Sequence, residues 1–298
     1  MMKNKMKFLL AATALSAVIS CGTSTTVPVS GRSQRISVSD GELLTLSKQE
    51  YAKFMASAKR STDLRKSQMV ERVGRRLATA VENYLRNNGY AAEVNNFNWE
   101  FNLVQDKQAN AFCMPGGKIV VYEGLLPITQ DEAGLAIVLG HEIAHAVAKH
   151  SAEQLTKRQN QQIGTSIVGS ILNSTLGSGV GDLASQVASG ALEIRNLKYS
   201  RDHEYEADYM GLIFAAMAGY NPQTAISFWQ RMASSSNNGS ADFLSSHPAD
   251  SKRIAYLQTK MNEALKYYQP ATQKTTTKTF QNPSSSSTTT NKKTGKRR

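Results

Sequence analysis

Two histidines and a glutamate lie together in the stretch 141–145, His-Glu-Ile-Ala-His. The surrounding run 131–150 is rich in apolar residues and contains no proline, so we expect a helix there. On a helix, His141 and His145 project from one face about 40° apart and can bind a single metal ion. Glu142 lies about 100° from His141, where it can act as a base toward a water molecule without binding the metal.

This spacing is the HExxH motif of zinc peptidases, in which the glutamate is the general base. The alternative is a buried helix with two hydrogen-bonded histidines and a glutamate at its surface. Glu142 weighs against this alternative, because a carboxylate within an apolar helix is costly to bury without a partner. The chain has five histidines, and two of them have this spacing. The motif predicts one zinc ion per chain and requires a third protein ligand.

The third ligand must come from acidic residues after His145. A HExxHxxGxxH continuation is excluded, because Ala148 and Ser151 occupy its last two defining positions. The densest acidic cluster is 200–208, Ser-Arg-Asp-His-Glu-Tyr-Glu-Ala-Asp, which opens an apolar helix extending to Met217. The candidates are Glu153, Asp182, Glu193, Asp202, Glu204, Glu206 and Asp208.

Glu204 and Asp208 are four residues apart and share one face of that helix, whereas Glu206 points the opposite way. One face can therefore offer a metal ligand and, one turn later, a carboxylate that accepts the N–H of a ligating histidine. The alternative is a solvated acidic helix start, which the helix dipole favours at any N-terminus. These residues by themselves leave both interpretations open.

Three segments occur in the order His-Glu-Ile-Ala-His, 200–208 followed by Met-Gly, and Ser-His-Pro-Ala-Asp-Ser-Lys-Arg-Ile at 246–254. Together they resemble the HExxH zinc metalloendopeptidase family that includes HtpX and BepA, and most of all its soluble periplasmic lipoprotein branch. The similarity covers about residues 65–267. It implies an α+β, mainly α, gluzincin-like zinc metallopeptidase domain with a small β-sheet and a substrate-binding edge strand.

The resemblance also implies a role for each site residue. The zinc ligands would be His141, His145 and Glu204, the catalytic base Glu142, and the carboxylate supporting a ligand Asp208.

Two further residues belong to the third segment of the resemblance. His247 matches a loop histidine that can approach the zinc in the periplasmic branch, and we expect it to have a gating or transition-state role. The alternative is a histidine at the entry of a helix that begins near Pro248. Arg253 matches the arginine of the same segment, and we expect it to position His247 or the oxyanion.

Several elements must place these side chains. Periodic apolar residues predict helices over 47–59, 63–87 and 250–267. His150 lies about 140° round the predicted metal helix from His145, so we expect a structural role away from the metal.

A β portion precedes the metal helix. The pattern predicts strands over 97–104, 108–114 and 118–122, with a Pro-Gly-Gly turn at 115–117. An extended polypeptide can pair its backbone with an exposed strand edge. The segment that resembles the family's substrate-pairing edge strand is Asn110, Ala111 and Phe112. An ordinary sheet strand is the alternative.

The two ends of the chain differ in composition from its middle. Residues 1–20 have a basic start and an apolar core, and they resemble a lipoprotein signal peptide ahead of Cys21, whose lipidation this implies. An ordinary signal peptide followed by an unmodified cysteine is the alternative. The Ser/Thr-rich stretch 21–46 is expected as a tether, 47–269 as the catalytic domain and 270–298 as a disordered basic tail.

The formal net charge is +12, but it is concentrated at the two ends. Three lysines lie in residues 1–20 and seven basic residues in 270–298, which leaves about +2 for the body. We therefore expect no nucleic-acid partner. We expect a periplasm-facing lipoprotein of the bacterial envelope, held by its lipid anchor in the outer membrane, with envelope assembly machinery as a partner.

The function expected from these features is zinc-dependent hydrolysis of peptide bonds in exported, misfolded or misassembled envelope proteins. The alternative is an envelope lipoprotein chaperone or assembly factor that binds extended polypeptides with little cleavage.

Overall fold

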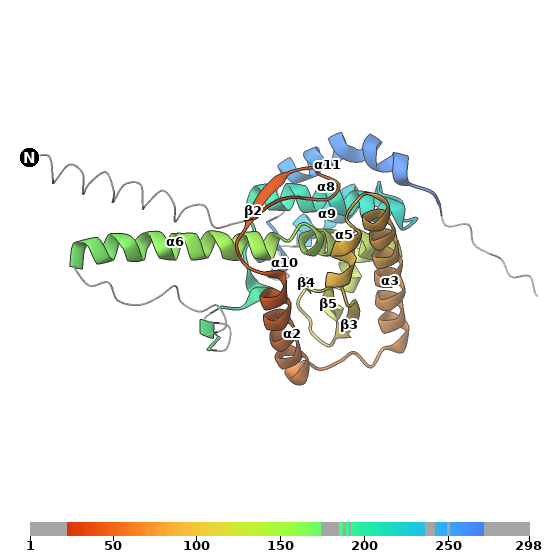
Figure 1. Cartoon of the computed structure of the whole chain (residues 1–298). Helices are drawn as coiled ribbons and strands as arrows, with labels where there is room; N and C mark the ends of the chain where they lie inside the picture. The colour runs from red at the N-terminus through yellow and green to blue at the C-terminus, as the bar shows by residue number, and fades with distance from the viewer. Residues whose placement is uncertain are drawn as a thin grey trace, which may run out of the picture.

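The computed structural model describes residues 23–173, 185–186, 189–190, 192–235, 242–248 and 251–270. These parts are mainly helical, as predicted, and contain two small sheets where one was expected (Figure 1). The helices are α2 (Asp40–Ser57), α3 (Leu64–Asn87), α4 (Leu126–Thr129), α5 (Glu132–Val147), α6 (His150–Asn173), α8 (Arg201–Met217), α9 (Thr224–Ser235), α10 (Asp242–Ser246) and α11 (Ser251–Ala264), with 3-10 turns η1 (Ala91–Asn96), η2 (Glu123–Leu125), η3 (Ile194–Asn196) and η5 (Leu265–Tyr267). The strands are β1 (Thr23–Thr26), β2 (Ser33–Ile36), β3 (Glu100–Val104), β4 (Ala111–Met114) and β5 (Lys118–Tyr122).

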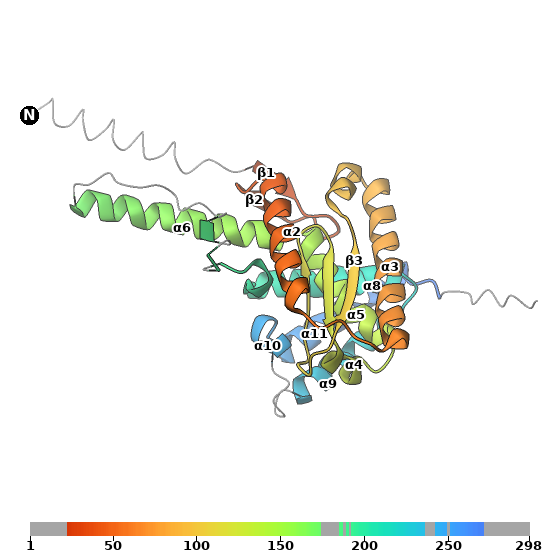
Figure 2. The same ribbon diagram turned by 90° about the horizontal axis from the view of Figure 1, so that it is seen from below.

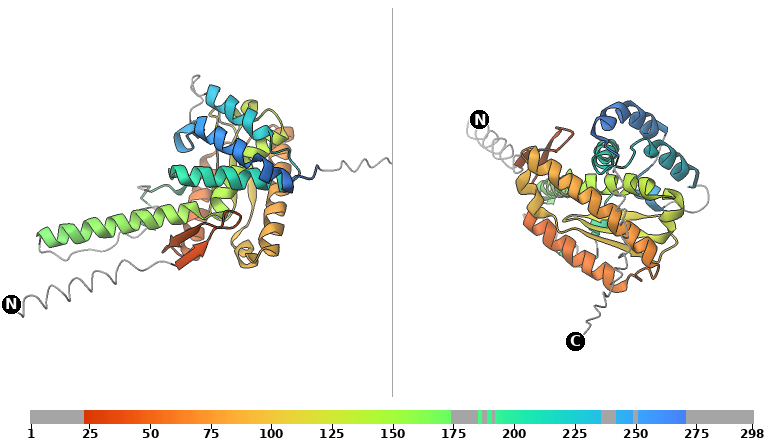
Figure 3. Two further views of the ribbon diagram at one scale, coloured as in Figure 1. Left: turned by 90° about the horizontal axis from the view of Figure 1, so that it is seen from above. Right: turned by 90° about the vertical axis from the view of Figure 1, so that its right-hand side faces the viewer.

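The larger sheet has the strand order β3-β5-β4, with β3 parallel and β4 antiparallel to β5. The strand expected at 108–114 is thus an edge strand. The sheet lies between α2 on one face and α3 and α5 on the other (Figures 2 and 3). Phe112 and Met114 pack toward α2, whereas Ala111 and Cys113 pack toward α5, as the alternation of a strand requires. Both faces of β4 are therefore buried.

Helix α3 confirms the helix predicted over 63–87, and its periodic apolar residues form one stripe. Asp63 caps it by accepting a hydrogen bond from the backbone N–H of Lys66, and the stripe is buried against the sheet and α5. Its buried members include Val73, Leu77, Val81 and Leu85. Helix α3 packs against both α5 and β3 and so holds α5 in place beside the sheet.

The expected tether is folded from residue 23 onward. Strands β1 and β2 form an antiparallel hairpin, and α2 begins at Asp40, seven residues earlier than the predicted helix. Val27, Ile36 and Val38 are buried, and the side chain of Ser39 accepts a hydrogen bond from the N–H of Glu42. This Ser-Asp-Gly-Glu run is a helix-capping sequence, and the apolar residues that flank it need a core to pack against.

The expected metal helix ends earlier than predicted. Helix α5 stops at Val147, Lys149 adopts a positive φ of 56°, and the chain turns into a new helix, α6, at His150. Helix α6 extends away from the rest of the protein (Figures 1 and 3). Because of this break, the angular position assigned to His150 on a continuous helix is wrong, and its ring lies beside His145.

Some parts of the expected organisation lie outside the described residues. These are the signal peptide 1–20, the proposed lipidation site Cys21 and the basic tail beyond residue 270. Among the described helices, none combines the length and the apolar character that crossing a membrane demands.

Candidate metal centre

Four buried side chains from three parts of the fold converge on one point. His141 and His145 come from α5, Glu204 from the first turn of α8, and His247 from the chain just after α10. One ligand atom from each lies within 4.8 Å of the others. The structure thus brings together the three ligands expected from the sequence and adds His247 to them.

The spacing of the donor atoms fits a zinc ion. His141 Nε2 lies 3.1 Å from His145 Nε2 and 3.3 Å from His247 Nδ1. Glu204 Oε1 lies 3.0 Å from His247 Nδ1 and 3.5 Å from His145 Nε2. Tetrahedral zinc with bonds of about 2.0–2.1 Å requires donor atoms about 3.3 Å apart. The nitrogen and oxygen donors also match the ligand types that zinc prefers.

Asp208 and Arg253 hold residues of the donor cluster in position through hydrogen bonds and an ion pair. Asp208 Oδ1 accepts a hydrogen bond from His141 Nδ1 at 3.0 Å, so His141 directs Nε2 toward the other donors. Arg253 binds both oxygens of Asp208 at 2.7 Å and lies 3.0 Å from Glu204 Oε2. It also donates to the carbonyl oxygen of His247 at 3.3 Å. Arg253 therefore connects the carboxylates of α8 to the loop of His247, and its guanidinium faces these groups.

Glu142 lies beside the cluster and not within it. Its Oε2 accepts a hydrogen bond from the backbone N–H of Cys113 in β4 at 3.2 Å. Its buried Oε1 has no hydrogen-bond partner among the described residues, and His247 Nε2 lies 3.6 Å away. A carboxylate oxygen placed in this way can take a proton from a water molecule next to the metal site.

His247 presents its two ring nitrogens to different neighbours. Nδ1 faces His141 and Glu204 at the place of a fourth ligand, and Nε2 faces Glu142. A catalytic zinc site keeps its fourth position open for water or substrate. With His247 in this position, the four side chains together offer a complete tetrahedral donor set.

The electrostatics of the site favour a positive charge at its centre. Burial lowers the pKa of His141, but Asp208 and Glu204 outweigh burial and raise it to about 9. Burial, followed by the neighbouring His141, holds the pKa of His145 well below its usual range. Burial raises the pKa of Glu204, but the histidines, His247 first, outweigh it and keep the carboxylate ionised. A divalent cation satisfies these opposing demands, because it replaces the proton between neutral imidazoles and a carboxylate.

A cleft of about 400 Å³ runs along β4 and is lined by His247. One wall contains the three residues expected to bind substrate, Asn110, Ala111 and Phe112. The other wall is formed by Arg195 and Asn196 of η3, by Lys198, and by residues 245–247. An extended chain in this cleft would lie against the edge of β4, next to the cluster.

Comparison with known proteins decides the family. Residues 66–261 match the model of peptidase family M48. The chain belongs to this family. As an M48 peptidase it is a zinc metallopeptidase, and the cluster of three histidines and one glutamate could hold its metal ion.

The curated relatives include mitochondrial metalloendopeptidases and bacterial β-barrel assembly-enhancing proteases. The mitochondrial metalloendopeptidase OMA1 of Schizosaccharomyces pombe is 38% identical over 174 residues, 57% of this chain and 49% of that protein. The OMA1 of Homo sapiens is 30% identical over 247 residues, 80% of this chain and 46% of that protein. The β-barrel assembly-enhancing protease of Yersinia pestis is 28% identical over 171 residues, 55% and 35% respectively. The chain thus spans about half the length or less of these relatives. It was expected to resemble the periplasmic branch most of all, but it also resembles the mitochondrial proteins.

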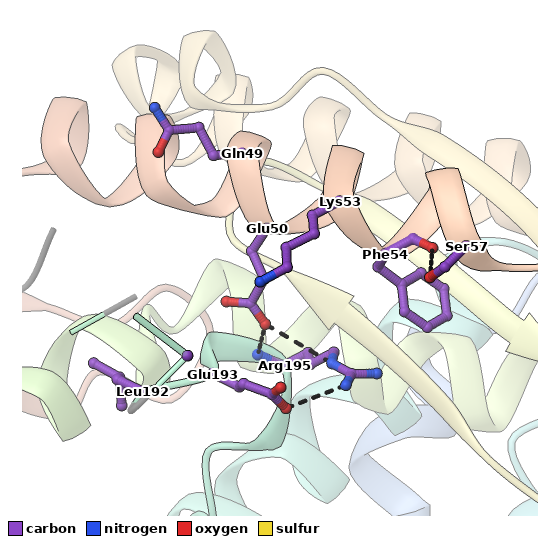
Figure 4. A pocket seen from close by; sticks show the side chains of 9 residues that line it. Gln49, Glu50, Lys53, Phe54, Ser57, Leu192, Glu193 and Arg195 are labelled. Atoms are coloured by element: carbon purple, nitrogen blue, oxygen red, sulfur yellow. Dashed lines mark hydrogen bonds and ion pairs between the residues drawn. The ribbon is translucent and has the colours of Figure 1, made fainter. Parts of the chain in front are cut away.

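A second pocket, of about 310 Å³, lies between α2 and the segment of Gly190, Leu192, Glu193 and Arg195 (Figure 4). Glu50 accepts hydrogen bonds from the backbone N–H groups of Ile194 and Arg195 at 2.7 and 3.2 Å. Glu193 and Arg195 form an ion pair at 3.1 Å. These contacts hold the segment around η3 beside β4, where it forms a wall of the cleft lined by His247.

The M48 metal site depends on a close crossing of α5 and α8 at two glycines. A Cβ atom on Gly140 would lie 2.7 Å from the carbonyl oxygen of Gly211, and one on Gly211 would lie 2.6 Å from the backbone N of His141. The two backbones are therefore in contact one residue before the first histidine ligand. This contact brings Glu204 and Asp208 of α8 within reach of His141.

Replacing Gly211 with Ala is expected to destabilise the protein by about 1–3 kcal/mol, because the added methyl group forces the two helices apart. The same displacement moves Glu204 away from the histidines, so zinc affinity should fall as well. Thermal unfolding and chelator competition measure the two effects. Gly41→Ala, at a glycine with nothing near its Cβ position, is the control. Unchanged zinc affinity in a destabilised Gly211→Ala variant would show that the crossing does not set the metal geometry.

Proposed function

We propose that this M48 peptidase is an endopeptidase that cleaves extended polypeptides bound along β4, and that its substrates are misfolded or misassembled envelope proteins. The observation that carries the proposal is the position of Glu142. One oxygen of its carboxylate accepts the N–H of Cys113 on the outer edge of β4. The other oxygen lies 3.6 Å from His247 Nε2 in the metal cluster. A substrate strand paired with this edge would have its peptide bond next to both the base and the metal site.

The residues of the chain divide the chemistry among them. Zinc, when bound, acidifies water and polarises a carbonyl group. Glu142 takes the proton of the attacking water on Oε1 and returns it to the leaving amine. Burial raises the pKa of Glu142, with His247 and His141 acting in the opposite direction, which makes the carboxylate a stronger base than an exposed one. For His247 two roles are open, a gate that occupies the place of the fourth ligand or a donor to the developing oxyanion, and the His247→Ala variant separates them.

We propose that His247 gates the site, since its Nδ1 occupies the place of the fourth ligand. Replacing His247 with Ala is expected to raise the rate of cleavage of an unfolded substrate while lowering zinc affinity by about 10-fold or more. Both quantities are measured on the purified protein, with Glu132→Gln as a control outside the cluster, where Glu132 pairs with Arg72. A slower reaction at full zinc occupancy would assign His247 to transition-state stabilisation instead of gating.

We propose an envelope location on the basis of the signal-like residues 1–20 and the following Cys21. The β-barrel assembly-enhancing relatives support this location, whereas the OMA1 relatives are mitochondrial. In a bacterial host, Cys21→Ser is expected to release the protein from the membrane fraction into the soluble fraction, because a lipidated thiol would be lost. Membrane association that survives this substitution would exclude the lipid as the anchor.

The position of His247 at the place of the fourth ligand favours one second candidate, a chaperone or assembly factor that holds extended chains on β4 without cutting them. Purified protein and an unfolded casein-like substrate separate the two. A peptidase produces fragments, loses activity in a zinc chelator and regains it when zinc is restored. Binding without fragments, by the wild type and by the His247→Ala variant, would establish the chaperone and overturn the peptidase.

A further inference from the structure

The zinc ligand His145 has a second neighbour on the side away from the metal. Its Nδ1 lies 2.8 Å from Nδ1 of His150, the first residue of α6. The other ring nitrogen of His150, Nε2, lies 2.9 Å from Glu206 Oε2. His145 and His150 are at most 1% exposed and Glu206 is 7% exposed, so water does not compete for these contacts. The positive φ of Lys149 creates the turn that returns His150 to His145.

This order of contacts fixes where the protons lie. An ionised carboxylate accepts hydrogen bonds only, so Nε2 of His150 must carry the proton that Glu206 accepts. In a neutral imidazole the other nitrogen is then an acceptor, and Nδ1 of His150 accepts from Nδ1–H of His145. The lone pair of His145 is thereby left on Nε2, the atom that faces the metal cluster. His141 obtains the same result from Asp208 directly.

The N-terminal hairpin holds the far end of this chain. Arg32, in the hairpin, donates from Nε to Glu206 Oε2 at 2.7 Å and from a terminal nitrogen to Glu153 Oε2 at 2.9 Å. The hydroxyl of Ser30 also donates to Glu206. Glu153 in turn binds His203 Nε2 at 3.1 Å, and the His203 ring stacks on His150 with 4.3 Å between ring centroids. The hairpin thus holds the carboxylate of Glu206 in place, and this carboxylate orients His150.

We propose that His150 and Glu206 are positioning residues for the metal ligand His145, and that Arg32 makes the N-terminal hairpin part of the metal centre. Glu206, which faces away from the cluster, acts through His150 as Asp208 acts on His141. The proposal depends on the metal site alone and is independent of the substrate and of cleavage.

The first test measures zinc affinity of the full chain by competition with a chelator. His150→Phe keeps a ring for stacking but removes the acceptor, and residues that orient a ligating histidine are worth about 10–100-fold in metal affinity. His150→Asn places an amide oxygen near the position of Nδ1 and is expected to restore most of the affinity. Equal affinities for the wild type and a folded His150→Phe variant would overturn the proposal, as would a His150→Asn variant no better than His150→Phe.

The second test concerns the hairpin and uses Arg32, whose side chain is partly exposed. Arg32→Ala is expected to lower zinc affinity by about 10-fold, since Glu206 loses its main anchor. It should also change the visible spectrum of the Co²⁺-substituted protein, which reports ligand geometry. The matched control is Arg76→Ala, because Arg76 is also half-buried but binds the carbonyl oxygen of Ala218 and the ring of Tyr220. If both arginine variants bind zinc like the wild type, the hairpin is not part of the metal centre.

Discussion

Replacing Glu142 with Gln is expected to abolish peptide cleavage and leave zinc bound. Glu142 is 2% exposed and lies outside the donor cluster, so the amide removes the base without removing a ligand. Its oxygen can still accept the N–H of Cys113, which keeps the edge of β4 in place. Proton transfer by a positioned base contributes about 10²–10⁴-fold to a rate, and the loss should be at least of this size.

The measurement combines a cleavage assay on an unfolded substrate with elemental analysis of the purified variant. Glu132→Gln is the matched control, because Glu132 lies in the first turn of the same helix and pairs with the exposed Arg72. The control should cleave at the wild-type rate. Cleavage by a zinc-loaded Glu142→Gln variant at a comparable rate would remove Glu142 from the mechanism.

The parts of the site that sequence analysis predicted are those fixed by local geometry. The i, i+4 spacing of His141 and His145 needs nothing beyond a helix, and the same holds for Glu204 and Asp208. The start of α8 was readable because Ser200 is a capping residue, and its side chain accepts the N–H of His203. Local periodicity therefore placed each pair on one helix face, whereas the role of Glu204 as a ligand was implied by the family resemblance.

How the halves meet could not be derived from local patterns. The positions of His247 and Arg253 next to the ligands were expected from a family resemblance, since the packing of α11 against α8 determines where that loop lies. Gly140 and Gly211 are a sequence signal for the packing of α5 against α8. A glycine inside a helical pattern has a cost that a close packing contact can explain. Paired in space, these two glycines identify the crossing of α5 and α8.

The errors have equally specific causes. Neither Ala148 nor Lys149 is a helix-breaking residue, so the sequence does not indicate the turn that brings His150 to His145. The segment 23–46 was misjudged because its Ser and Thr content outweighed its short alternating apolar pattern. Both errors concern the same part of the protein, since the hairpin and His150 meet at Glu206.

Replacing Glu204 with Ala is expected to lower zinc affinity by more than about 100-fold, the upper limit for residues that merely orient a ligand. Two effects add. The variant loses an oxygen donor within 3.5 Å of both histidines of α5, and it leaves the Arg253 guanidinium, now 3.0 Å from Glu204 Oε2, with one carboxylate fewer. A less balanced positive charge next to the site repels the cation.

Chelator competition and elemental analysis of the purified Glu204→Ala variant measure this loss, and Glu193→Ala is the control. Glu193 was a candidate ligand, but it pairs with Arg195 at the rim of the second pocket and is absent from the donor cluster. The control should bind zinc like the wild type, because no donor atom changes. The opposite result, with zinc retained by Glu204→Ala and lost by Glu193→Ala, would mean that α8 does not complete the metal site. In that case the close crossing at Gly140 and Gly211 would have another purpose than joining the carboxylate to the two histidines.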